Sequence, residues 1–307
     1  NNNNVLTERE KAIKDYEDNY IGSLCNDPGW TGSTTGCVAG TISQEARTKV
    51  LQRLNYFRRL CGLEDNVVEN PAQHQACQEA SLIFKAEGNL SHFPPSGWKC
   101  WTQDGYNAAG KSNIAIGSAT SGDYCVHSTY GITGFIEDAG ANNKPVGHRA
   151  WFLLPGLQKI GIGSTNTTSC IMWEDNFNPS AAGPDFVAYP AAGYMPNQLV
   201  FPRWSFSNPG GAGYTGANVE MTDETGANVS LNIVHKGSAS GGWPDSRIVW
   251  EPNVNVSNIV NDVKYTVTVS GITGAPESSY TYEVIIFPAT PSYKKIAGEK
   301  GGMKIIK

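Results

Sequence analysis

The chain has 307 residues, of which 39% are hydrophobic and 17% charged, a composition typical of a folded protein with a lightly charged surface. Its net charge of -5 provides no basic face for phosphates, so nucleic acid is not expected as a partner. The sequence also contains no apolar run of the roughly 20 residues that a bilayer-spanning helix needs, so we expect no transmembrane segment.

Residues 1–44 are interpreted as an N-terminal extension. The stretch "LTEREKAIKDYEDNY" predicts a charged helix, and a segment rich in Gly, Thr and Ser follows, which holds Cys25 and Cys37 and is interpreted as a closed surface loop. The opening "NNNNVLTERE" lacks the basic and apolar regions of a secretory leader, so we expect none in this sequence.

Residues 45–175 combine helical and strand patterns. In "SQEARTKVLQRLNYFRRLCGL", apolar residues at spacings of three and four follow Ser43, which suits a helix N-cap. The next stretch, "NPAQHQACQEASLIFKAEG", has Pro71 near its first turn and small residues along one side, which favours a second helix. A third helix is predicted near residues 127–138, and "KIGIGST" and "SCIMWED" predict two short strands joined by a turn at Asn166.

Residues 176–203 are rich in Pro, Gly and Ala and are interpreted as a linker. From residue 204 to 307 the pattern has a period of two, which predicts an all-β module, most simply a sandwich. Within it, "NVEMTDETGANVSLNIV" predicts a hairpin around a polar turn. A structural role is favoured for this module, and carbohydrate binding remains open.

The seven cysteines all lie in the first 170 residues, and none forms a CxxC pair. Together with sparse lysine, this pattern favours disulfides and an oxidising compartment, hence a secreted or cell-surface protein. The alternative is that the cysteines are reduced and pack as small apolar groups, which suits Cys61 and Cys77 inside helical patterns.

Two of the five histidines are placed where an element ends. His92, in "GNLSHFPP", follows the second predicted helix and precedes two prolines, whereas His148 follows Gly147 and precedes a bulky apolar run. Two imidazoles that converge in a cleft, with carboxylates nearby, can hold a divalent metal or move a proton. His74 and His127 are interpreted as an exposed helix residue and a helix cap.

The order of "LNYFRRLCGL", an alanine-spaced helix ending in "NLSH", "KSNIAIG", "GFIEDAG" and "VGHRAWFLLPGLQKIGIG" resembles the CAP superfamily, or SCP/TAPS, in its bacterial form. The resemblance covers residues 45–175. It implies an α-β-α sandwich with a large shallow cleft lined by two histidines and two acidic residues.

On this resemblance, the two cleft histidines are matched by His92 and His148. The family's Gly-Glu-Asn-Ile motif is matched by "KSNI", in which Ser112 stands for the glutamate while Asn113 is kept, so one cleft carboxylate is missing. The other is matched by Glu137 or its neighbour Asp138, with Glu137 preferred. The resemblance therefore implies a ligand cleft of five residues: His92, Ser112, Asn113, Glu137 and His148.

The expected fold class is α+β, with a CAP-like α-β-α sandwich at residues 45–175 followed by an immunoglobulin- or fibronectin-like sandwich at residues 204–307. Proximity in that proposed fold suggests two disulfides, Cys25 with Cys37 and Cys61 with Cys77.

The sequence contains no GxSxG, HExxH, Walker A or complete dinucleotide motif. The favoured hypothesis is a secreted or surface CAP-like protein that is not an enzyme and binds a lipid, glycan or protein partner in its His-lined cleft. One alternative is a metal-assisted, peptidase-like hydrolase, in which His92 and His148 hold Zn²⁺ and Glu137 is the base. Two nitrogen ligands are few for a catalytic zinc, so the hypothesis of a non-enzymatic binding protein is preferred over that of a hydrolase. A third hypothesis is an adhesin-like surface protein whose sandwich is the active part.

Overall fold

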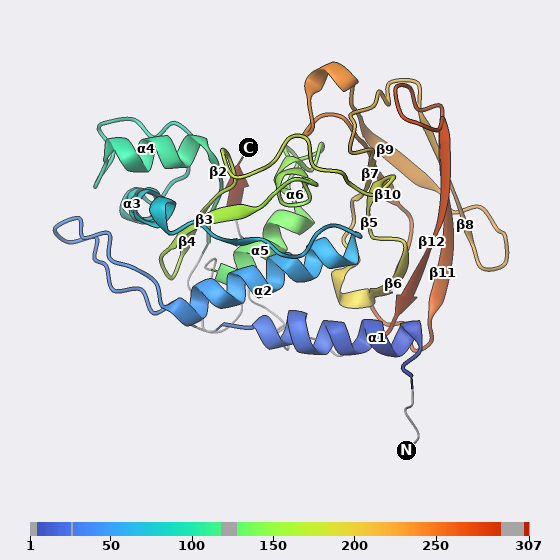
Figure 1. Cartoon of the computed structure of the whole chain (residues 1–307), viewed down its shortest axis with the longest axis horizontal. Helices are drawn as coiled ribbons and strands as arrows, with labels where there is room; N and C mark the ends of the chain where they lie inside the picture. The colour runs from blue at the N-terminus through green and yellow to red at the C-terminus, as the bar shows by residue number, and fades with distance from the viewer. Residues whose placement is uncertain (1–4, 26, 118–127, 290–303, 307) are drawn as a thin grey trace.

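The computed structural model describes residues 5–25, 27–117, 128–289 and 304–306, which form a mixed fold of helices and sheets (Figure 1). The fold is thus of the expected α+β class. The helices are α1 (Glu8–Asp15), α2 (Gln44–Leu60), α3 (Pro71–Glu87), α4 (Gln103–Gly110), α5 (Ser128–Glu137) and α6 (Gly147–Phe152).

The boundaries of α2 and α3 follow from their capping residues. The Ser43 hydroxyl accepts the backbone N–H of Ala46 at 3.1 Å and so begins α2. Pro71 opens α3, where its missing N–H costs nothing, and Gly88 ends it in the left-handed conformation with φ 73°. The predicted starts of these two helices, at Ser43 and Pro71, are confirmed.

The first sheet has the strand order β1-β3-β4-β2-β13. Its strands are β1 (Val68–Glu69), β2 (Ser112–Ile116), β3 (Lys159–Ser164), β4 (Thr168–Met172) and β13 (Lys304–Ile306). The antiparallel pair β3 and β4 confirms the two strands predicted around Asn166.

This first sheet carries helices on both faces because its side chains alternate. Ile114 and Cys170 pack into one hydrophobic cluster with residues of α3 and α4, whereas Ala115 and Ile171 belong to the second cluster, with residues of α2 and α5. Helix α3 lies very close to β3, since a Cβ at Gly163 would overlap the backbone of α3. Glycine is therefore required at that position.

The later part of the chain forms two four-stranded sheets, with orders β5-β7-β10-β9 and β6-β12-β11-β8 (Figure 1). Rings from the two sheets meet between them: Phe206 and Tyr282 lie 6.2 Å apart, as do Trp204 and Tyr265. The strands are β5 (Val187–Tyr189), β6 (Gly193–Pro196), β7 (Trp204–Ser207), β8 (Asn218–Asp223), β9 (Leu231–Lys236), β10 (Ile248–Pro252), β11 (Val263–Ser270) and β12 (Ser279–Phe287).

Three sequence interpretations of this region differ from the structure. The predicted hairpin is confirmed only at its turn, where an antiparallel bridge joins Thr222 to Asn228; beyond the turn, β8 pairs with β11 and β9 pairs with β10, in opposite sheets. A local turn in which Asp223 accepts the N–H of Ala227 at 3.0 Å ends β8 before the chain crosses over. Residues 187–189 and 193–196, interpreted from the sequence as linker, form β5 and β6. Finally, β13 pairs with β2 of the first sheet and not with the later sheets.

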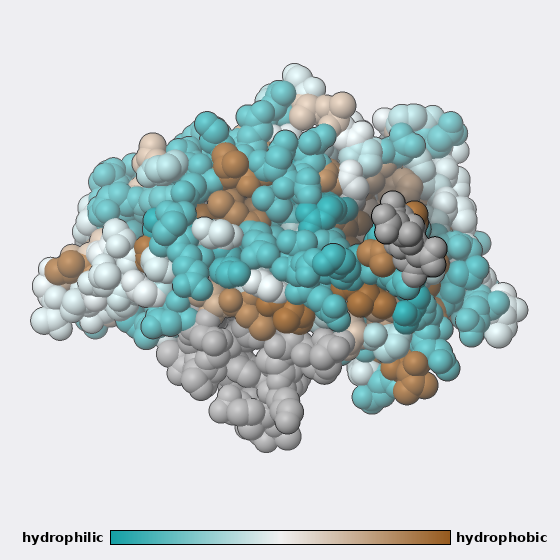
Figure 2. Space-filling view, turned by 60° about the horizontal axis from the view of Figure 1, so that its bottom comes forward, coloured by the Kyte–Doolittle hydropathy of each residue, from teal (hydrophilic) through white to brown (hydrophobic). Residues whose placement is uncertain are grey.

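The two parts share one hydrophobic core. Tyr189 of β5 lies 6.3 Å from Phe57 of α2, ring to ring, and both belong to a cluster that extends from Tyr16 to Phe287. On the face shown in Figure 2, hydrophilic residues dominate and hydrophobic ones gather in small groups. Within the described residues, no helix has both the length and the apolar character needed to cross a membrane.

The cysteines do not pair as expected. Cys37 is joined to Cys100, with Cα atoms 5.1 Å apart, while Cys25 and Cys61 are buried thiols, as are Cys77 and Cys170. Both suggested pairings are wrong. The pair Cys61 and Cys77 fails because these residues belong to different hydrophobic clusters, and Cys25 is buried instead of lying in the surface loop with Cys37. Cys125 lies outside the described residues.

Candidate functional site

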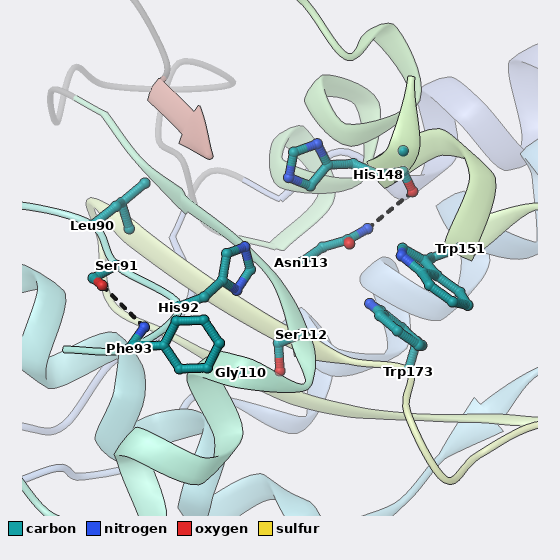
Figure 3. A pocket seen from close by; sticks show the side chains of 11 residues that line it. Leu90, Ser91, His92, Phe93, Gly110, Ser112, Asn113, His148, Trp151 and Trp173 are labelled. Atoms are coloured by element: carbon teal, nitrogen blue, oxygen red, sulfur yellow. Dashed lines mark hydrogen bonds between the residues drawn. The ribbon is translucent and has the colours of Figure 1, made fainter. Parts of the chain in front are cut away.

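A cavity of about 460 Å³ lies where the loop after α3 meets β2 and α6 (Figure 3). It brings together four of the five cleft residues implied by the sequence: His92, Ser112, Asn113 and His148. The other lining residues are Leu90, Ser91, Phe93, Gly110, Gly147, Trp151 and Trp173.

His148 is held by the carboxylate of Asp138. It is the second residue of α6 and is only 2% exposed. Its Nδ1 lies 2.8 Å from Asp138 Oδ1, and its backbone N–H donates to Asp138 Oδ2 at 2.9 Å. The ring also stacks on Phe135, with centroids 5.5 Å apart. These contacts fix the orientation of the imidazole and occupy Nδ1.

His92 is held in a different way, from the loop that follows α3. Its Nδ1 lies 2.7 Å from the carbonyl oxygen of Ala109. Since a carbonyl oxygen only accepts, Nδ1 carries the hydrogen and donates it. The neighbouring Phe93 is 68% exposed at the edge of the cavity.

Ser112 and Asn113 connect β2 to the elements around it. The Ser112 hydroxyl donates to the carbonyl of Ala108 at 2.6 Å, and the Asn113 amide donates to the carbonyl of His148 at 3.0 Å (Figure 3). Asn113 therefore ties the strand to the helix that carries His148. Ser112 supplies a hydroxyl to the cavity and no carboxylate.

Sequence reasoning missed the aromatic part of this cavity. Trp151, in the bulky apolar run that follows His148, lines the cavity and stacks on Trp173, with ring centroids 3.6 Å apart and planes at 10°. Its position was recoverable, because residues three apart on a helix share a face and Trp151 follows His148 by three. Trp173, just after β4, had no such sequence signal.

Of the two candidate acids, Asp138 is the one that contacts His148. Asp138 is fully buried in the left-handed conformation, φ 53°, directly after α5. Glu137 is not among the described residues that line the cavity, and its backbone carbonyl accepts a hydrogen bond from Arg149 Nη2 at 3.2 Å.

The described residues do not supply the ligand set of a catalytic zinc ion. Such a site usually has three protein ligands, and the described residues contain no cluster of three or more His, Cys, Asp or Glu side chains that could hold a metal.

Helix α6 is also held by the later sheets. The buried Arg149 guanidinium donates from Nη1 to the Arg203 carbonyl at 2.9 Å and to the Ser205 hydroxyl at 3.0 Å, and it lies over the Tyr189 ring. Burial lowers the pKa of Arg149 below its ordinary value. The Trp243 indole N–H donates to the carbonyl of Ala150, in the middle of α6, at 2.7 Å. The two-sheet part therefore fixes the helix that carries His148 and Trp151.

Together, the fold and the site define an α+β protein with a small cavity lined by aromatic, histidine and amide side chains. No protein-family model matches the sequence, and no curated protein matches it.

Proposed function

We propose that this protein is a CAP-like binding module of an oxidising compartment, secreted or at the cell surface, that holds a ligand in the cavity between His92 and His148. The supporting observation is that four segments distant in sequence converge on this cavity, which combines the rings of Phe93, Trp151 and Trp173 with a few oriented polar groups. The Cys37–Cys100 disulfide is compatible with such a compartment.

The polar groups favour binding over catalysis. A general base or metal site needs a carboxylate or imidazole that faces the reacting atoms. The described residues that line the cavity offer only the imidazoles of His92 and His148, and the Asp138 carboxylate is buried against His148. The Ser112 hydroxyl donates to a backbone carbonyl, which disfavours its use as a nucleophile. The cavity is not filled by side chains, which argues against the sandwich as the sole binding part.

The proposal is tested by a ligand screen monitored by NMR. The chain has 8 tryptophans, each with one indole N–H signal, and the signals of Trp151 and Trp173 can be assigned from Trp151→Phe and Trp173→Phe variants. The screened compounds are short saccharides, fatty acids and short peptides. We expect at least one compound to shift both signals saturably. If the folded protein binds none of them, or binds only where other signals move, the proposal is wrong.

A further inference from the structure

The indole of Trp173 holds a buried donor, Nε1, beside the cavity that has no partner among the described residues. Indole nitrogen only donates, and buried donors without a partner are rare in folded proteins, because each one loses its hydrogen bond to water. Because Nε1 is closed to solvent when the cavity is empty, a ligand oxygen reaches it only when a neighbouring side chain moves aside, and the oxygen then satisfies the group.

The second observation is the arrangement of aromatic side chains around a polar centre. In Figure 3, Phe93 and Trp173 lie on opposite sides of Ser112, and Asn113 lines the same cavity. Asn113 uses its amide nitrogen on His148, so its Oδ1 retains acceptor capacity. A ligand that suits this arrangement has an apolar face for the rings and an edge of donors and acceptors.

The third observation concerns charge. None of the described residues that line the cavity is Lys, Arg, Asp or Glu. A charged ligand would lose its hydration without gaining an opposite charge from them, and an acyl chain would leave the Trp173 and Asn113 groups unpaired. The lining therefore matches a ligand that is polar and neutral.

We infer that the cavity binds a neutral saccharide unit, with a sugar C–H face packed on the aromatic rings and a sugar oxygen accepting from Trp173 Nε1. This inference rests on the proposed function and names its ligand class. A volume of about 460 Å³ lies within the usual range of small-molecule sites.

The test is a titration of the whole chain with N-acetylglucosamine, chitobiose and cellobiose, followed by calorimetry and by the indole NMR signals. We expect at least one saccharide to bind and to shift the Trp173 signal. Trp173→Phe keeps an aromatic ring but removes the N–H, so it should weaken that binding at least tenfold. Phe93→Ala, at an exposed position, should also weaken it without affecting folding.

The matched control is Trp30→Phe. The Trp30 indole donates to the carbonyl of Ala39 at 2.8 Å, and this residue does not line the cavity, so its loss should leave saccharide affinity unchanged.

The outcomes separate the two proposals. If a fatty acid or peptide shifts the signals of Trp151 and Trp173 and no saccharide does, the ligand class is wrong and the binding function stands. If no class of compound binds, both are wrong. Saccharide binding that is equal in wild type, Trp173→Phe and Phe93→Ala would place the site elsewhere and would overturn the inference.

Discussion

Asp138 contacts His148 twice, with Oδ1 at 2.8 Å from the ring Nδ1 and Oδ2 at 2.9 Å from the backbone nitrogen. One buried carboxylate thus fixes both the start of α6 and the direction of the imidazole. The fixed ring is what makes His148 part of a preformed wall of the cavity.

Replacing Asp138 by Asn is expected to destabilise the protein by about 1–3 kcal/mol, because an amide has one acceptor oxygen for two donors, and one buried contact is lost. The ¹⁵N NMR signals of the His148 ring should also change, since Nδ1 loses its carboxylate partner. Denaturant unfolding and ring ¹⁵N spectra are the measurements. Glu137→Gln is the control, and it should change the free energy of unfolding and the His148 ring signals less than Asp138→Asn does. A larger effect of Glu137→Gln on both measurements would make Glu137 the acid of the site.

Arg149→Met should cost about 3 kcal/mol or more, because the Arg203 carbonyl and the Ser205 hydroxyl both lose a buried donor. The control is Arg9→Met, which removes an ion pair with Asp262 near the surface and should cost less than about 1 kcal/mol. Urea unfolding of both variants gives the comparison. Equal losses would show that Arg149 does not join α6 to the sheets.

The Cys37–Cys100 disulfide closes a loop with a sequence separation of 63 residues, so its removal should cost about 2–4 kcal/mol. The double variant Cys37→Ser/Cys100→Ser should lower the melting temperature by about as much as chemical reduction of the wild type does. In the folded wild type, iodoacetamide at about pH 8 should leave Cys61 unlabelled, because burial raises the pKa of its thiol to about 12. Labelling of Cys37 or Cys100 without reductant, detected by mass spectrometry, would contradict the disulfide.

His74 should make the protein less stable in mild acid. Its Nδ1 accepts the backbone N–H of Ile162 at 3.1 Å, and burial, together with the nearby Arg47, lowers its pKa below 6.5 despite the opposing effect of Glu69. The unfolded chain therefore binds a proton first, and stability falls as the pH drops below about 6.5 through the lower folded value.

The measurement for His74 is the free energy of unfolding at about pH 8 and about pH 5 for wild type and His74→Gln. The variant should be less stable at the higher pH and should lose less on acidification. The same loss in both proteins would assign the acid sensitivity to other groups.

Local sequence signals were sufficient for the elements with clear caps, and less so for those that depend on distant contacts. Ser43 and Pro71 marked the starts of α2 and α3 correctly, because a cap acts within one turn. The strand pairing of β8 and β9 could not be read locally, because each is stabilised by a different neighbouring strand.

The residues of the cavity also differ in whether a local sequence signal predicts them or a distant contact places them. His92 and His148 were picked out by their positions at element ends, and both line it. Trp173 was missed because its contact with Trp151 joins β4 to α6, and no spacing along the chain encodes that meeting. Asp138 could not be separated from Glu137, since the left-handed conformation that turns its side chain towards His148 is not visible in the pattern.

The shared hydrophobic core determines how cooperatively the protein unfolds. Because Phe57 of α2 packs on Tyr189 of β5, neither part can lose its packing without exposing apolar surface of the other. Heating should therefore give a single calorimetric transition, with equal calorimetric and van't Hoff enthalpies. The saccharide or other ligand held near His148 would then raise the melting temperature of the distant β-strands as much as that of the helices.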